Sequence, residues 1–407
     1  MLVAVLGAGI QGACVALELA LNGVQVHLYD RGNLPLARAS SHNEGKLHLG
    51  YVYANDSSLR TARMMAKGAV VFQRLMQRWV GDAIDAIPIS APFYYVVHRD
   101  SLVSEIEIDA HLRAAHAIVL EESNDDSVSY FGSDYREMPA RLSTTECQAT
   151  FDQRSVKAAY RTAEIGIDSE ALAVLVRARL SQESKICCHL GSHIRAVNLL
   201  NGEGARVEFE ADGRKHHAAY DHVVNTLWDG RLAIDHSVGI KPPRPWLYRI
   251  RHYMRLRCFD DPHLLPTTTI VLGAFGDIVA YNNGEAFLSW YPAGMKGLSS
   301  DLSPPSWPMT LEPTVSLTLR DQILKSLATI VPAVAHLSCE TVESARIKAG
   351  IVFAWGSTDI PDIRSGLHER YAVGPQSYGR YHSIDTGKLT MAPYFAKMLA
   401  DQILENE

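Results

Sequence analysis

Residues 1–30 combine a strand, a glycine-rich turn, a helix and a second strand that ends in an acid. Leu2–Leu6 is an apolar run of the kind that a buried parallel strand shows. The turn that follows, Gly7–Gly12, reads G-x-G-x-x-G and leads into an alanine- and leucine-rich helix that continues to about Asn22. Val24–Tyr29 returns as a strand, and Asp30 stands at its end. This order is typical of a parallel α/β sheet and of few other folds.

Each residue type in this unit has a chemical reason to be there. Gly7 permits a tight turn, Gly9 lets backbone N–H groups approach a pyrophosphate, and Gly12 lets the helix pack against the strand. The helix N-terminus directs roughly half a positive charge towards the phosphates. Asp30 follows Gly12 by 18 residues, a spacing at which an acid accepts the hydroxyls of an adenosine ribose. The unit therefore predicts a dinucleotide-binding site, because a merely flexible turn would not explain the acid.

Size and composition indicate an ordinary globular protein with two domains or one elaborate domain. The chain has 407 residues, of which 47% are hydrophobic and 21% are charged. Its net charge of −6 gives no basic surface, so we expect no nucleic-acid partner. No targeting segment, membrane span or C-x-x-C pair is recognisable, and we expect a cytoplasmic protein with reduced cysteines. The 17 histidines show no H-E-x-x-H spacing, so we expect no metal. The oligomeric state stays open.

The middle of the chain predicts three strands separated by tight turns. The strands are Ile186–Leu200, Ala205–Ala211 and His216–Thr226. The turns between them, Asn201-Gly202 and Asp212-Gly213, are strong hairpin signals. We expect a β-meander whose last strand returns to the nucleotide-binding domain.

Several helix boundaries are marked by capping residues. Ser143 and Glu146 fit a capping box. Asp168 is a good N-cap for a helix that continues to about Ser181. Helical periodicity also predicts a helix from about Ser57 to Val80 and a last helix from about Lys388 to Glu405.

Two further stretches favour a flavin over a nicotinamide cofactor. Ser40–Tyr53 follows the second strand, and Tyr381–Pro393 places a loop of small residues before the last helix. In an interleaved fold, that helix returns to the cofactor with its positive end towards the flavin ring. Reduced flavin is anionic at N1 and C2=O, so this helix end, with Lys388, would stabilise it.

Taken together, these segments resemble the FAD-dependent oxidoreductases of the D-amino-acid oxidase and glycine oxidase superfamily. The matching segments are the glycine turn with Asp30-Arg31, Ser40–Gly50, Asp221–Thr226 followed by Trp228, and Gly387–Pro393. The loop from His42 to Tyr53 is similar to that of L-2-hydroxyglutarate dehydrogenase. Gly387–Thr390 is similar to a segment of flavin-linked glycerol-3-phosphate dehydrogenases.

The resemblance implies an α/β protein in which a Rossmann-like FAD-binding domain is interleaved with a mixed α+β substrate domain containing a large, mainly antiparallel sheet. Residues 1–82, 143–235 and 340–407 would form the FAD-binding domain, and residues 83–142 and 236–339 the substrate-binding domain. FAD would be noncovalent, because the loop at His42 lacks the signature of histidine-linked relatives. The implied cofactor contacts are Gly7, Gly9, Ile10, Gln11, Gly12, Asp30, Arg31, Ser40, Ser41, His42, Asn43, Gly45, Lys46, Leu47, His48, Ile194, Thr226, Trp228, Gly387, Lys388, Leu389 and Thr390.

One departure from the superfamily concerns the substrate. Amino-acid oxidases of this type hold the substrate carboxylate with an arginine in a G-L-R-P-like turn, whereas Trp355–Thr358 contains no arginine. Asp385 lies where a second basic residue would sit and would repel a carboxylate, so we expect simple α-amino acids to be disfavoured. The candidate substrate contacts are Tyr291, Arg380 and Asp385. Other candidate anion binders are Arg346, Arg364 and the strand residues Arg249, Arg251, Arg255 and Arg257, which either hold an anion or are solvated.

The implied reaction is hydride transfer from a small polar metabolite to flavin N5, oxidising a C–N or a C–O bond, with oxygen or another electron acceptor taking the electrons. An alcohol would need a base, and His48 is the candidate catalytic residue; alternatively, it only hydrogen-bonds the flavin or the backbone. One alternative is a 2-hydroxy-acid or polyol-phosphate dehydrogenase that passes electrons to a quinone or carrier. Others are a nicotinamide-dependent dehydrogenase and a flavin-binding subunit without its own turnover.

Overall fold

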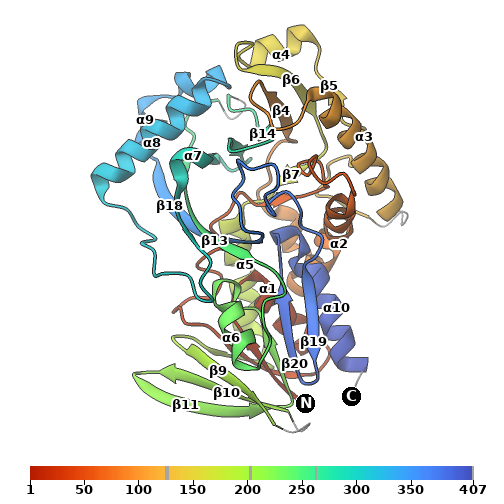
Figure 1. Ribbon diagram of the computed structural model, residues 1–407, viewed down its shortest axis with the longest axis vertical. Helices are drawn as coiled ribbons and strands as arrows, with labels where there is room; N and C mark the ends of the chain where they lie inside the picture. The colour runs from red at the N-terminus through yellow and green to blue at the C-terminus, as the bar shows by residue number, and fades with distance from the viewer. Residues whose placement is uncertain (124–127, 201–203, 262–263, 406–407) are drawn as a thin grey trace.

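The N-terminal unit forms the centre of a six-stranded sheet in the computed structural model, which describes residues 1–123, 128–200, 204–261 and 264–405 (Figure 1). β1 (Leu2–Leu6) pairs in parallel with β2 (Gln25–Tyr29) and with β12 (His222–Asn225). The outer strands are β8 (Ile186–His189) beside β2, and β20 (Tyr381–Asp385) and β19 (Gly374–Tyr378) beyond β12. Since β20 also runs parallel to β12, the carboxyl ends of strands from distant parts of the chain meet at one edge.

Helices cover this sheet and share its core. α1 (Ile10–Leu21) is buried from Ile10 to Ala20, because its alanine-rich sequence lets neighbours approach on every side. α10 (Ala392–Glu405) packs against it, as does α2 (Arg60–Val80). α5 (Ser169–Gln182) completes the layer, and its N-cap Asp168 accepts hydrogen bonds from two backbone N–H groups, as predicted. Within the described ranges, no helix combines the length and apolar character needed to cross a bilayer.

The second layer of the molecule is a nine-stranded, mainly antiparallel sheet. Its longest strand, β13 (Trp246–Arg257), pairs with β16 (Glu285–Trp290), β17 (Met295–Ser299) and β18 (Arg346–Trp355). The other strands are β15 (Gly276–Ala280), β14 (Thr268–Val271), β4 (Tyr94–His98), β6 (Val156–Arg161) and β5 (Ala140–Arg141). The predicted fold class, a parallel nucleotide-binding sheet with a large antiparallel one, is confirmed.

Smaller elements complete the fold. The meander consists of β9 (His193–Leu199), β10 (Ala205–Ala211) and β11 (Arg214–Tyr220). The short pair β3 (Lys46–Leu47) and β7 (Ile165–Gly166) brings the loop after β2 against the large sheet. The remaining helices are α3 (Glu105–Glu122), α4 (Thr144–Thr150), α6 (Arg231–Ser237), α7 (Tyr291–Gly294), α8 (Pro313–Ala328) and α9 (Cys339–Glu343), and the 3-10 turns are η1 (Gly81–Ala86), η2 (Trp228–Gly230), η3 (Pro332–His336) and η4 (Leu389–Met391).

Local predictions held where side chains mark a boundary and were wrong where a strand changes sheets. The capping box of Ser143 and Glu146 is formed by both of its hydrogen bonds. Ile186–Leu200 is not one strand but two, β8 and β9. Gly191, with φ +67°, turns the chain out of the six-stranded parallel sheet and into the meander. The segment predicted as His216–Thr226 likewise divides into β11 and β12. The helix predicted from Lys388 begins only at Ala392, after the turn η4. The predicted Asn201-Gly202 turn lies outside the described residues.

Two strands depart from the expected domain division. β18 lies within 340–407 and β6 within 143–235, yet both pair into the large antiparallel sheet. The chain joins the parallel sheet again only at β8 and at β19, which lie in the same two expected segments. The chain nevertheless alternates between the two sheets in five segments, as expected, and the domain boundaries stay a prediction.

Candidate functional site

A cavity lies where the carboxyl ends of β1, β12 and β20 face the large sheet. The residues that follow these three strands, Gly9–Gln11, Thr226 with Trp228, and Thr386–Leu389, line one side of it. Residues from β13, β14, β15, β16 and β18 line the other side. Ligands of open α/β sheets bind at such an edge.

The glycine turn at this edge is closed tightly by its neighbours. Gly7 has φ +100°, and a Cβ there would lie 2.9 Å from the carbonyl oxygen of Thr226. A Cβ on Gly12 would lie 1.9 Å from the carbonyl oxygen of Gly7. Thr226 Oγ1 donates to the carbonyl oxygens of Leu6 and Gly7, at 2.8 and 3.0 Å. These contacts bring the N-terminus of α1 directly to the cavity wall.

Asp30 is held at the same turn. Its Oδ2 accepts from the backbone N–H of Ala8 at 2.8 Å and its Oδ1 from that of Gly32 at 2.8 Å. Ser40 Oγ accepts from the N–H of Ile10 at 2.8 Å and itself lines the cavity. Thus the loop after β2 is fastened to the start of α1.

The predicted cofactor contacts fall into two groups. Those that line the cavity are Gly9, Ile10, Gln11, Ser40, His42, Asn43, Lys46, His48, Thr226, Trp228, Gly387, Lys388 and Leu389. Those that belong to the surrounding elements without lining it are Gly7, Gly12, Asp30, Arg31, Ser41, Gly45, Leu47, Ile194 and Thr390. Among the second group, Arg31 forms an ion pair with Asp229 at 2.5 Å, and Ile194 packs in the core beneath the meander.

The loop of residues 40–53 is folded by its own side chains. Asn43 Nδ2 donates to the carbonyl oxygens of Ala39 and Ser40, and its Oδ1 accepts from the N–H of Gly45. His42 Nδ1 lies 2.8 Å from the carbonyl oxygen of Ala349 on β18, and burial lowers the pKa of its ring. The loop is therefore fixed between the two layers.

His48 is buried at the end of this loop. Its backbone N–H donates to Thr390 Oγ1 at 2.9 Å, which joins the loop to the turn before α10. Nδ1 of the ring has no hydrogen-bond partner. Burial, together with the positive charges of Lys388 and Lys46, holds the pKa of His48 well below its usual range. The imidazole is therefore neutral at pH 7.

A carboxyl group that the sequence did not reveal stands behind His48. Glu164 is fully buried between β6 and β7, and it accepts from the N–H of Leu49 at 2.6 Å and from the hydroxyl of Tyr95. Burial raises the pKa of Glu164 to about 7, against the opposing effect of Lys46. No motif marks Glu164, because only the pairing of β3 with β7 brings its segment beside the loop of His48.

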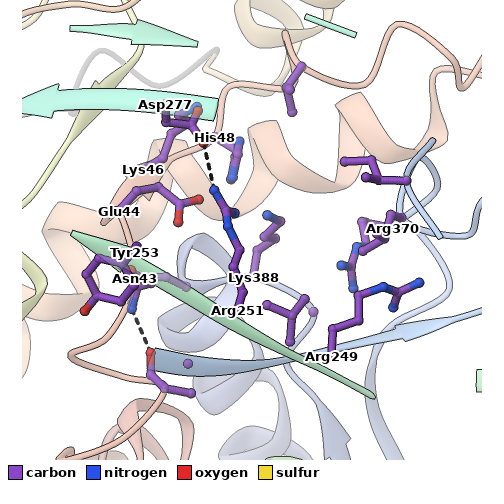
Figure 2. A pocket seen from close by; sticks show the side chains of 18 of the residues that line it. Asn43, Glu44, Lys46, His48, Arg249, Arg251, Tyr253, Asp277, Arg370 and Lys388 are labelled. Carbon is purple, nitrogen blue, oxygen red and sulfur yellow. Dashed lines mark hydrogen bonds and ion pairs between the residues drawn. The ribbon is translucent and has the colours of Figure 1, made fainter. Parts of the chain in front are cut away.

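The wall contributed by the large sheet and the C-terminal turns is rich in positive charge (Figure 2). Two carboxylates, Glu44 and Asp277, also line the cavity. The cationic side chains that line it are Lys46, Arg249, Arg251, Arg370 and Lys388. Asp277 is shared, since it lies 3.2 Å from Lys46 Nζ and 3.5 Å from Arg251 Nη2. Burial lowers the pKa of Lys388 to about 8.

Two arginines lie close together at one end of this wall. Arg249 donates to Asp359 at 2.6 Å and to the carbonyl oxygen of Thr358 at 2.9 Å. Arg370, whose Nη1 donates to the carbonyl oxygen of Phe353 at 2.7 Å, lies beside it (Figure 2). The stretch Trp355–Thr358 indeed supplies no arginine, but the loop that follows it supplies Arg370. Sequence reasoning missed this residue, since it stands outside any recognisable motif.

The arginines of β13 have three different environments. Arg249 and Arg251 line the cavity. Arg255 is buried in an ion pair with Asp168 at 2.6 Å, and Arg257 is exposed. Neither of the two expected roles, anion binding or solvation, therefore applies to all four arginines of this strand.

Of the three candidate substrate contacts, only Tyr291 lines the cavity. Arg380 stands just before β20, at the amino end of the parallel strand and thus away from the cavity, where its Nη1 lies 2.6 Å from His222 Nε2. Asp385 is at the carboxyl end, but its oxygens are taken by Trp355 Nε1 at 2.7 Å and by the N–H of Gly387 at 3.1 Å. The structure does not bring these two residues into the cavity.

The polar atoms of the cavity wall indicate a polar ligand. In the described part of the chain, five of the ten buried polar side-chain atoms without a hydrogen-bond partner belong to residues that line this cavity. They are Gln11 Oε1, His48 Nδ1, Tyr53 Oη, Arg251 Nε and Arg370 Nε. A helix N-terminus at a glycine turn suits a pyrophosphate, and unpaired donors farther along suit a polar ring and an anion. The donor set therefore fits FAD with a small polar substrate.

Comparisons with known proteins agree with this geometry. Several solved structures share the fold, among them the following three. They are glycine oxidase from Geobacillus kaustophilus (TM-score 0.70, 16% identity, 100% of this chain and 95% of that chain), L-α-glycerophosphate oxidase from Mycoplasma pneumoniae with FAD bound (0.68, 13%, 99% and 94%), and L-amino acid deaminase from Proteus myxofaciens (0.65, 14%, 100% and 90%). No curated protein matches the chain.

The family model described as FAD dependent oxidoreductase (DAO) matches residues 3–402. The chain therefore belongs to this family, and it is an FAD-dependent oxidoreductase. The predicted superfamily and cofactor are confirmed. Whether FAD is attached noncovalently stays a prediction.

Proposed function

We propose that this flavoenzyme oxidises a C–N bond in a small, negatively charged, amino-acid-like metabolite. The observation that carries the proposal is the excess of cationic over anionic side chains in the cavity wall, with unpaired Nε atoms on Arg251 and Arg370. A buried guanidinium N–H without an acceptor is costly, and a bound carboxylate would satisfy it. Simple α-amino acids, which the sequence disfavoured, thereby return as candidates.

The residues around the cavity would have different roles in the reaction. FAD, when bound, supplies the hydride acceptor. Arg370, whose Nε has no partner among the described residues, would hold the substrate's anionic group at one end of the wall, and this would orient the carbon that is oxidised. Tyr53, Tyr253 and Phe287 line the cavity and would exclude water from it. An amine in its neutral form needs no strong base to lose a hydride.

A second candidate is oxidation of a C–O bond in a 2-hydroxy acid. The observation that favours it is the neutral, unpaired Nδ1 of His48, which could take the proton of an alcohol. The electron acceptor would then be oxygen, a quinone or a carrier protein.

Anaerobic bleaching of the flavin tests both candidates. The purified flavoprotein is mixed with three series of the same carbon skeletons: amino acids, the corresponding 2-hydroxy acids, and the amino acid amides, which lack the carboxylate. Bleaching by the amino acids and not by their amides is the expected result. Bleaching by the hydroxy acids alone would support the second candidate. Equal bleaching by acids and amides would contradict a role for the cationic wall.

A further inference from the structure

A group of metal-binding side chains lies at the edge of the parallel sheet, away from the cavity. In the register of β2 and β8, His27 stands opposite Cys187, and Tyr29 stands opposite His189. Side chains alternate along a strand, so His27, Cys187 and His189 point to the same face of the sheet. No residue of this trio lines the flavin cavity.

The three side chains are close enough to share one ion. One ligand atom from each lies within 4.8 Å of the others, and the two imidazole rings have their centroids 4.7 Å apart. Ligands at zinc distances of about 2.0–2.3 Å would be roughly 3.5 Å apart in a tetrahedron. Small side-chain rotations would therefore close the site around an ion.

The surroundings prepare both histidines for this role. The hydroxyl of Tyr220 lies 3.0 Å from His27 Nδ1, which fixes the ring and leaves Nε2 for an ion. Nε2 of His189 is buried and has no hydrogen-bond partner among the residues that the structure describes. An unpaired buried nitrogen in such a place needs an explanation, and a ligated cation supplies one.

We propose that His27, Cys187 and His189 bind a divalent transition-metal ion of the zinc type, with water as the fourth ligand. A thiolate with two imidazoles is a donor set that suits Zn²⁺ and does not suit Mg²⁺ or Ca²⁺. On binding, the Cys187 thiol releases its proton and forms the metal–sulfur bond. The ion fastens the edge strand β8 to β2. The expectation of no metal arose because the ligands come from two strands that are distant in sequence and form no motif.

The adjacent residue Cys188 offers a matched control. It lies on the same strand, but alternation directs it to the opposite face. The holoenzyme is stripped with a chelator, dialysed against zinc chloride, freed of loose metal by gel filtration, and assayed for zinc, protein and FAD. We expect one zinc per chain in the wild type and in Cys188→Ser, and loss of that zinc in Cys187→Ser and His189→Ala. FAD content serves as the check on folding. A wild type that retains no zinc, or a Cys187→Ser variant that retains it, would overturn the proposal.

Alkylation of the wild type tests the same site without a substitution. The flavoprotein is treated with a maleimide with and without zinc, and the labelled cysteines are identified by mass spectrometry. Zinc should slow labelling of Cys187 by about tenfold or more and leave Cys188 unaffected, because a metal-bound thiolate is no longer a free nucleophile. Equal labelling of Cys187 in both samples would overturn the proposal even if the variants failed to fold.

Discussion

Nδ1 of His48 lies 3.8 Å from Oε1 of Glu164, and both side chains are buried beside the flavin cavity. Their environment shifts the pKa values of these two groups in opposite directions. It lowers the pKa of His48 well below its usual range and raises the pKa of Glu164 to about 7. Near neutral pH the imidazole is therefore unprotonated, while the carboxyl holds its proton for part of the time. Glu164 is thus the member of the pair whose protonation changes in this pH range, while His48 stays neutral.

The first prediction concerns stability. Glu164 binds its proton more tightly in the folded protein than its ordinary value of 4.5 implies, so its contribution to stability is complete below about pH 4.5 and is lost as the pH rises through about 7. Glu164→Gln carries no charge, and its amide oxygen can still accept from the N–H of Leu49. Its amide N–H group can only donate, so the hydroxyl of Tyr95, which donates to Glu164 in the wild type, would have to accept instead. Between pH 5 and 8, the Tm of Glu164→Gln should therefore rise relative to that of the wild type. The corresponding difference in the free energy of unfolding should approach about 3 kcal/mol.

The matched control is Glu343→Gln, at an exposed carboxyl group. Its Tm difference from the wild type should stay flat over the same pH range. A flat difference for Glu164→Gln as well would mean that Glu164 is charged throughout that range.

A second prediction separates catalysis from cofactor binding at His48. His48→Ala should keep FAD, since the backbone N–H that bonds Thr390 remains. If His48 takes a proton from the substrate, rapid-mixing measurements should show flavin reduction slowed by about 10²–10⁴-fold. The exposed His336→Ala is the control. Unchanged reduction kinetics would leave His48 only a structural role and favour amine oxidation.

How far the sequence predicts this site depends on where its residues get their positions. The glycine turn, the acid at the end of β2 and the caps Ser143 and Asp168 act through neighbours in sequence, so pattern alone was sufficient for them. Glu164 and Arg370 act through strand pairing and loop packing, and their surroundings in sequence carry no period or motif. The same reason hid the trio of His27, Cys187 and His189.

Strand direction explains the error at Arg380. The sequence predicts only a loop of small residues before the last helix, whereas Tyr381–Asp385 forms β20, which Arg380 immediately precedes and Asp385 ends. Because β20 joins a parallel sheet, only the carboxyl end faces the cofactor edge. Arg380 consequently lies by His222, far along the strand from the cavity-lining turn at Gly387.

A third prediction tests the anion site. Arg370→Leu should raise the KM for an anionic substrate by about 10–100-fold, the loss expected for a charge-assisted hydrogen bond. The KM for an uncharged analogue should change little. Arg364→Leu, on the same loop but exposed and paired with Asp362, should behave like the wild type. Equal losses for charged and uncharged compounds would show that Arg370 supports the loop and not the substrate.

The glycine turn gives a fourth prediction. A Cβ on Gly9 would lie 3.1 Å from Ser40 Oγ, so the branched side chain of Gly9→Val would intrude on the cavity beside the start of α1. We expect a folded but colourless protein, checked by its visible absorption and circular dichroism. Gly230→Ala is the control, since a Cβ there meets only ordinary contacts of 3.5 Å or more. A yellow Gly9→Val would contradict the placement of the pyrophosphate.

The last prediction concerns Lys388 and can be checked by its pH dependence, because the pKa of about 8 falls inside the pH range in which the flavin potential can be measured. Below that pH the ammonium group is charged and, at the turn before α10, would stabilise negative charge on the reduced flavin. Lys388→Met removes that charge, so the flavin midpoint potential should fall at pH 6–7. Above about pH 8 the wild-type lysine loses its own proton, and the two potentials should converge. A difference that stays constant from pH 6 to 9 would mean that Lys388 affects the flavin through packing and not through charge. The exposed Lys325→Met should show no difference at any pH.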